Sequence, residues 1–170
     1  MSLIDIIRQT RSGGVIAVGT ADDAITALTG SSYHLVVFAG AEHGPPPQAL
    51  RDKTGRTTKV FHAPLVDDAR PIGVAELLVL NQAAEYVRQA FSKDRRVLIT
   101  SAGGRNRACL IAALALEKKY GCGGKEAIRE VRDRRVRGPQ PALSNPHFIA
   151  LLARIARKPN GVLRLDKEAA

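Results

Sequence analysis

The stretch from position 95 to position 121 constrains the fold more than any other part of the chain. Two arginines precede a short run of aliphatic and β-branched residues, Val97-Leu98-Ile99-Thr100, and a turn with two glycines follows. Residues 108–116 are then apolar, and the segment closes on Lys118-Lys119-Tyr120-Gly121. A buried strand, a tight turn and a buried helix that ends on cations and a glycine are typical of α/β folds.

Further apolar runs predict the remaining elements. Strands are expected at residues 14–18, 34–38 and 59–65, with Pro64 near an end or edge because proline cannot donate a ladder hydrogen bond. Apolar residues recur at helical spacing in residues 74–91, 124–135 and 146–155, which are expected to be helices. Either Ser144 or Asn145 is expected to cap the last helix, with Pro146 in its first turn.

The order of these elements defines a fold class. Strands that alternate with helices predict a mainly parallel central sheet covered by helices on both faces. The glycine- and proline-rich stretch 40–47 and the stretch 138–144 are expected to be loops. The sequence shows neither an internal repeat nor a long linker, so residues 1–170 are expected to form a single α/β domain.

Composition narrows the class of protein. Hydrophobic residues make up 45% and charged residues 25% of the chain, which supports a packed core and argues against a disordered tail. The two cysteines, Cys109 and Cys122, are too few for a disulfide scaffold. The uncharged run 24–41 is interrupted by polar residues and does not predict a membrane span, and no signal segment is found. A soluble, cytoplasmic protein is therefore expected.

The net charge of +10 predicts an anionic partner. Part of this charge gathers between positions 118 and 137. The simplest interpretation is that part of this cluster is the solvated face of a helix, and the alternative is a docking surface for an anionic partner. The residues concerned are Lys118, Lys119, Lys125, Arg129, Arg132, Arg134, Arg135 and Arg137.

The turn at residues 100–107 lies where α/β folds bind ligands, between the carboxyl end of a strand and the first turn of the next helix. Successive backbone N–H groups can converge there on an anion. Gly103 and Gly104 permit a tight cradle, and the planar guanidinium of Arg107 suits phosphate. The sequence contains neither the P-loop pattern nor a Rossmann G-x-G-x-x-G after its first strand, so neither kind of nucleotide-binding protein is expected.

Residues 97–108 resemble the loop H-C-x-x-G-x-x-R-[ST] of the dual-specificity, cysteine-dependent phosphatase superfamily. Gly104 and Arg107 match the glycine and the arginine of that pattern, and Ser101 stands at the position of the nucleophilic cysteine. The resemblance covers most of the chain, because the neighbouring helical segments and Asn145-Pro146-His147-Phe148 also fall where such phosphatases have similar segments. It implies a cysteine-phosphatase-like fold.

The resemblance also implies roles for individual residues. Ser101 takes the nucleophile position, and Arg107 with the loop N–H groups stabilises the phosphate oxygens. The implied phosphate-binding residues are Ala102, Gly103, Gly104, Arg105, Asn106 and Arg107. A general acid is implied roughly thirty residues before the nucleophile. Asp67 and Asp68 lie 34 and 33 residues before position 101; the family spacing after Pro64 favours Asp67, and Asp68 stays open.

Three positions depart from the family pattern. Thr100 replaces a histidine that orients the loop, and Ala108 replaces a hydroxyl residue that assists the second step, which predicts slow turnover. Ser101 matters most, because a cysteine in such a loop can have a pKa of about 3.5–7.5, whereas a serine hydroxyl stays protonated. Cys109 lies inside the following helix, where we expect a small buried hydrophobe and not a substitute nucleophile.

The resemblance therefore implies a phosphomonoester hydrolase of dual-specificity type, present here in an inactive or nearly inactive form that binds phosphate. Ser101 has two explanations. An engineered Cys-to-Ser substitution is favoured by the intact acid loop, Gly104 and Arg107; the alternative is a natural pseudophosphatase that binds phosphorylated ligands. An RNA 5′-phosphatase-like protein is a further alternative, because Arg105-Asn106-Arg107 resembles the loop of RNA 5′-triphosphatases.

The resemblance implies no metal and no organic cofactor. The four histidines, at positions 34, 43, 62 and 147, lack metal-ligand spacing and are expected to be core or surface residues; only His62 lies beside the expected acid loop. The implied partner is a phosphorylated substrate, with a phosphoprotein ahead of a phosphoinositide or an RNA 5′ end.

Overall fold

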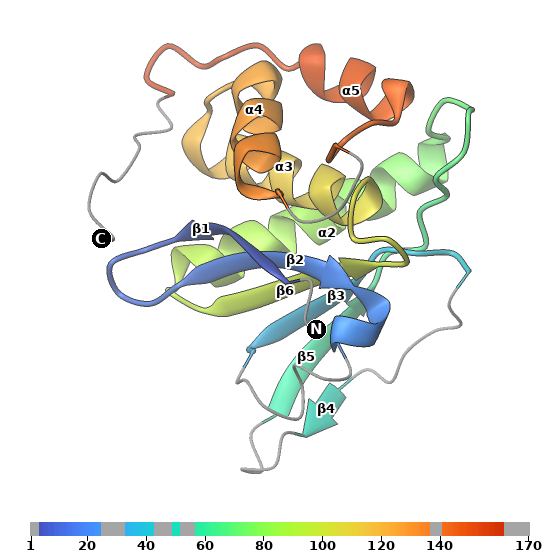
Figure 1. Cartoon of the computed structure of the whole chain (residues 1–170). Helices are drawn as coiled ribbons and strands as arrows, with labels where there is room; N and C mark the ends of the chain where they lie inside the picture. The colour runs from blue at the N-terminus through green and yellow to red at the C-terminus, as the bar shows by residue number, and fades with distance from the viewer. Residues whose placement is uncertain (1–3, 25–32, 43–48, 52–56, 137–140, 162–170) are drawn as a thin grey trace.

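Six strands form one sheet within residues 4–24, 33–42, 49–51, 57–136 and 141–161, which the computed structural model describes (Figure 1). In chain order they are β1 (Asp5–Gln9), β2 (Val15–Thr20), β3 (Leu35–Phe38), β4 (Ala49–Arg51), β5 (Thr57–His62) and β6 (Arg96–Ser101). Their spatial order is β1-β2-β6-β3-β5-β4. The inner strands β2, β6, β3 and β5 are parallel, and the edge strands β1 and β4 are antiparallel to their neighbours. The predicted mainly parallel sheet is confirmed.

Helices cover one face of this sheet, and Figure 1 shows them together on the same side. They are α2 (Val74–Ser92), α3 (Arg107–Tyr120), α4 (Gly124–Arg134) and α5 (Pro146–Ala153). Alternate strand residues, among them Ile16, Val37 and Ile99, pack against these helices in the main core. None of these four helices, nor any other helical residue in the described ranges, forms a segment long and apolar enough to cross a membrane.

The opposite face of the sheet has a smaller core. The intervening strand residues Val15, Val36 and Leu98 pack there with Ala24 and Tyr33. Helices were expected on both faces, but the described residues place only the short helical segment 21–24 with this second cluster. The expected flanking helices are therefore present, and they are distributed unevenly.

Neither edge strand was predicted from the sequence. β1 carries Asp5 and Arg8, both buried, and its register with β2 shifts between Ile6 and Arg8, so its sequence does not alternate as a regular strand does. β4 has three residues. The third predicted strand, 59–65, ends earlier, because the Leu65 N–H donates to the Ala63 carbonyl at 2.8 Å in a turn around Pro64.

The predicted helix ends are close to those observed. Gly121 caps the C-terminal end of α3: its φ of +60° is left-handed, and its N–H donates to the Glu117 carbonyl at 2.6 Å. Asn145 and not Ser144 caps α5, since its side-chain oxygen accepts from the His147 N–H at 2.9 Å. Residues 43–47 and 138–140 of the two predicted loops lie outside the described residues.

The basic cluster between positions 118 and 137 is a solvated face in part, as expected, because Lys125, Arg129 and Arg134 of α4 are exposed. Arg135 follows α4 and is only 5% exposed; its guanidinium pairs with Asp5 of β1. Arg132 donates to the carbonyls of Ala142 and Leu143 at 3.1 and 2.8 Å. Arg135 thus joins the end of α4 to the edge strand β1, and Arg132 joins α4 to the backbone of residues 142 and 143. Arg137 lies outside the described residues.

Removing the carboxylate of Asp5 tests the weight of this buried pair. We expect Asp5→Ala to lower the free energy of unfolding by about 3–5 kcal/mol, because Arg135 would keep its buried charge without that partner. Urea unfolding followed by circular dichroism measures the change. Asp133→Ala removes an exposed carboxylate of α4 and should stay within about 0.5 kcal/mol. Equal losses in the two variants would contradict the role given to Arg135.

Candidate functional site

The β6–α3 loop, residues 102–106, lies at the carboxyl end of an inner strand of the sheet. β6 pairs with β2 on one side and β3 on the other, and its last residue, Ser101, is 2% exposed. The loop then leads directly into Arg107, the first residue of α3. Backbone N–H groups at the start of a helix that follows a parallel strand favour the binding of an anion.

Gly104 gives the loop its shape. Its φ is +59°, its N–H donates to the Ser101 carbonyl at 3.1 Å, and its carbonyl accepts from Arg135 Nε at 3.1 Å. A Cβ at this position would stand 2.5 Å from the carbonyl oxygen of Gly19. Both the left-handed backbone and the close approach of β2 therefore require glycine here.

Several donors around the loop have no acceptor in the described part of the protein. The backbone N–H groups of Ala102, Gly103 and Arg105 donate to none of the described residues. Arg105 Nη1 and Arg107 Nε are buried and also lack a hydrogen-bond partner there. A buried unpaired donor is costly, so this concentration of N–H groups is suited to an anion with several acceptor oxygens.

Of the residues that carry these donors, Gly103, Arg105 and Arg107 border a small cavity of about 180 Å³. It is lined by Asp67, Ser101, Gly103, Arg105, Asn106, Arg107 and Ser144. Most residues named from the sequence thus come together at one place. Ala102 and Gly104 belong to the same loop and shape its backbone, whereas Asp68 lies apart.

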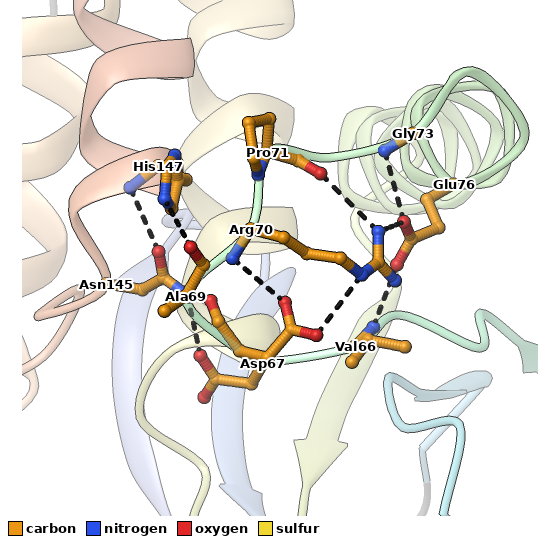
Figure 2. A network of polar contacts seen from close by, with 10 residues as sticks. Val66, Asp67, Ala69, Arg70, Pro71, Gly73, Glu76, Asn145 and His147 are labelled. Carbon is orange, nitrogen blue, oxygen red and sulfur yellow. Dashed lines mark hydrogen bonds and ion pairs between the residues drawn. The ribbon is translucent and has the colours of Figure 1, made fainter.

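Asp67 is held over this cavity by two amides from different parts of the chain. Asn106 Nδ2 donates to its carboxylate at 3.0 Å, and Asn145 Nδ2 donates to it at 2.9 Å. Asn145 Nδ2 also reaches the Asp68 carbonyl at 2.9 Å, and His147 Nε2 lies 2.9 Å from the Ala69 carbonyl. Figure 2 shows Asn145 and His147 beside this segment. The start of α5 therefore fixes residues 67–69 against the β6–α3 loop.

Asp68 belongs to a second, exposed network, whose members Arg70 and Glu76 are labelled in Figure 2. Its carboxylate lies 3.1 Å from Arg70 Nε, and Arg70 Nη1 lies 2.7 Å from Glu76 of α2. Glu76 also accepts from the Val66 and Gly73 N–H groups, both at 3.1 Å. The hydrogen bond from Arg70 is the main cause that lowers the pKa of Glu76. This network anchors residues 66–70 to α2, and the Asp68 carboxylate is paired with Arg70 in it.

Glu42 contacts Arg107, and this contact was not predicted from the sequence. Its carboxylate pairs with Arg107 Nη1, and the same nitrogen donates to the Leu65 carbonyl at 3.3 Å. The Arg107 side chain is 9% exposed, whereas that of Glu42 is 41% exposed, so the carboxylate approaches from the solvent side. A Cβ on Gly40 would stand 3.0 Å from both carboxylate oxygens, so glycine leaves room for this contact.

Cys109 takes no part in the cavity. Its thiol is buried in α3, 3.6 Å from the Gly104 carbonyl, and burial raises its pKa to about 12. It is a buried small residue, as expected. His62 Nε2 lies 3.0 Å from the Gly40 carbonyl and supports the turn that carries Glu42. Among the described residues no three His, Cys, Asp or Glu side chains are grouped so as to hold a metal ion.

A sequence signal was available for Glu42, but none was available for the contact that Asn145 makes with Asp67 in addition to capping α5. Glu42 follows β3, which neighbours β6, and the carboxyl ends of parallel strands meet at one edge of the sheet. That rule directs attention to residues 39–42. Asn145 was recognised as a helix cap, but its contact with Asp67 depends on a fold that brings residues 78 positions apart together.

Gly103 and Gly104 provide a matched pair for testing the loop. We expect Gly104→Ala to destabilise the protein by about 1–3 kcal/mol, because the new Cβ meets the Gly19 carbonyl and the backbone is left-handed. Gly103→Ala should leave stability nearly unchanged, since its nearest contact would be Arg105 Nε at 3.8 Å. Urea unfolding of both variants measures the difference, and equal stability would contradict this description of the loop.

Solved structures of phosphatases share this architecture. OH1 from the Orf virus, described as a tyrosine phosphatase with triple substrate specificity, has a TM-score of 0.59 and 20% identity over 84% of this chain and 83% of its own. Human DUSP28 has a TM-score of 0.59 and 19% identity over 87% and 90%. PTPMT1, solved in complex with PI(5)P, has a TM-score of 0.64 and 15% identity over 90% and 94%. No protein-family model and no curated protein sequence matches the chain. The likeness shows that this chain has the fold of the dual-specificity and tyrosine phosphatases.

Proposed function

We propose that the protein binds phosphomonoesters in the cavity at the β6–α3 loop and, with serine at position 101, hydrolyses them hardly at all. The observation that carries this proposal is the group of donors at the cavity. Arg105 Nη1 and Arg107 Nε are buried without acceptors in the described residues, and the backbone N–H groups of Ala102, Gly103 and Arg105 beside them donate to none of these residues either. A phosphate group offers the several negative oxygens that such a set of donors needs.

The chemistry of the proposed scaffold depends on a nucleophile at position 101. In a cysteine phosphatase a thiolate forms the bond to phosphorus, the leaving oxygen takes a proton from an acid, and water then releases phosphate. A serine hydroxyl needs a base to remove its proton. Within the described residues the Ser101 hydroxyl has no hydrogen bond to a histidine or a carboxylate. The first step is therefore expected to fail while binding persists.

Asp67 is the proposed acid and base of that scaffold. It lines the cavity together with Ser101 and Arg107, and two amides hold its carboxylate in place. Asp68 is the weaker candidate because its carboxylate pairs with Arg70. Ala108, which is fully buried at the start of α3, has no hydroxyl to assist the second step. Slow turnover is therefore proposed even where a thiol is supplied.

Restoring a thiol tests the proposal. We expect the chain with Ser101 to leave para-nitrophenyl phosphate intact and Ser101→Cys to release nitrophenol, because the loop donors would then face a thiolate. Adding Arg107→Ala to Ser101→Cys should reduce the rate by about 10²–10³. Steady-state absorbance measures the rates, and isothermal titration calorimetry with inorganic phosphate measures binding in parallel.

The outcomes separate the alternatives. An inactive Ser101→Cys variant that still binds phosphate would indicate a phospho-ligand binding module without a hydrolytic scaffold. Absence of phosphate binding in every variant would overturn the proposal itself. A phosphotyrosine peptide, a soluble phosphoinositide and a 5′-phosphorylated oligonucleotide, titrated at equal concentration, then rank the carriers of the phosphate; a phosphoprotein is the proposed carrier.

Glu42 predicts a specific effect on phosphate affinity. Its carboxylate contacts Arg107 and repels an incoming dianion, so we expect Glu42→Gln to tighten the binding of inorganic phosphate by about tenfold. Glu85→Gln is the control, because it removes a carboxylate that pairs with Arg88 on α2. Calorimetry measures both affinities. Weaker binding in Glu42→Gln would mean that Glu42 serves to aim the guanidinium.

A further inference from the structure

A second and larger cavity lies away from the β6–α3 loop. It has a volume of about 740 Å³ and is bordered by β5, by Leu35 of β3 and by the last turns of α2. None of its lining residues belongs to the cavity around Ser101. We call it the β5–α2 groove, and it is of the size that small-molecule sites have, roughly 300–1,000 Å³.

The floor of the β5–α2 groove is apolar and aromatic. Leu35 is 7% exposed, Phe61 is partly buried against the main core, and Tyr86 is 41% exposed. The Phe61 and Tyr86 rings meet edge to face, with centroids 5.0 Å apart. The chain has three tyrosines, four phenylalanines and no tryptophan, so two of its seven aromatic rings gather at this one cavity. An exposed aromatic ring in a concave site offers a contact surface for an apolar or planar group.

The border of the groove is positively charged. Lys59, Lys93 and Arg95 line it, and no aspartate or glutamate is among its lining residues. Within the described residues these three side chains form no ion pair, unlike Arg88 and Arg70, which pair with acids. The neighbouring carboxylates are already engaged: Glu85 pairs with Arg88 and accepts from Gln89, and Asp94 accepts from Thr10 at 2.8 Å.

We propose that the β5–α2 groove binds a small soluble anion with an apolar or aromatic body. The body would lie against Leu35, Phe61 and Tyr86, and a sulfonate, carboxylate or phosphate group would lie between Lys93 and Arg95. Charge complementarity selects the anion, and the apolar floor selects a ligand that is more than a free inorganic ion. This site is independent of the proposed phosphomonoester site, because the two share no residue.

The probe is naphthalene-2-sulfonate, and 2-naphthol is its neutral counterpart. Isothermal titration calorimetry on the full chain should show one saturable site for the sulfonate and binding at least about tenfold weaker for the naphthol. Lys93→Glu and Tyr86→Ala should each weaken sulfonate binding by about tenfold, by reversing a charge and by removing the aromatic contact. Both positions are exposed, so the variants are expected to fold, and circular dichroism checks this.

Matched controls separate this site from the other one. Lys125→Glu reverses an exposed charge on α4 and should leave sulfonate binding unchanged, as should Arg107→Ala. Sulfonate binding that is lost in Arg107→Ala and retained in Lys93→Glu would overturn the proposal, because the anion would then be at the β6–α3 loop. Binding to anionic phosphatidylglycerol vesicles without binding of the soluble probe would also overturn it and would indicate a membrane surface.

Discussion

The β6–α3 loop and the edge of the sheet at β1 both depend on the contacts of the buried Arg135 guanidinium. It lies at the end of α4, pairs with Asp5 of β1 and donates to the Gly104 carbonyl at 3.1 Å. A charge with 5% exposure is tolerable only when its donors find acceptors, and these come from an edge strand and from the loop. The left-handed turn at Gly104 is thereby fixed by contacts with distant parts of the chain. The shape of the cavity at the β6–α3 loop therefore does not depend only on the conformational preferences of the loop residues themselves.

The charges around the cavity are arranged differently from those that the cysteine-phosphatase pattern implies. In that pattern a thiolate places a negative charge opposite the arginine. Ser101 is neutral, and the negative charge in contact with Arg107 comes from Glu42. Asp67 adds a second carboxylate, whose oxygens accept from Asn106 and Asn145. An incoming phosphate would therefore exchange one anionic partner of Arg107 for another, and its affinity is set by a difference between two favourable interactions.

The inner strands and α2 to α5 could be predicted because their signals are local: apolar runs, helical spacing, Gly121 as a C-terminal cap and Asn145 as an N-terminal cap. The edges could not, since β1 buries Asp5 and Arg8 and its register is irregular. The residues of the β6–α3 loop could be predicted as site residues because they lie in one contiguous segment of the sequence. The choice between Asp67 and Asp68, and the presence of Glu42, depend on which strands become neighbours, which periodicity does not encode.

In the proposed function, binding and hydrolysis are separable because they would use different atoms. Binding would rely on backbone N–H groups, on the left-handed turn at Gly104 and on the guanidinium of Arg107, and all of these are present. Hydrolysis adds the requirement for an ionised nucleophile at the end of β6, and Ser101 does not supply one. The fold shared with the phosphatases is therefore compatible with the proposed binding of phosphate. The proposed loss of hydrolysis follows from Ser101, and Ala108 would slow the second step even where a thiol is supplied.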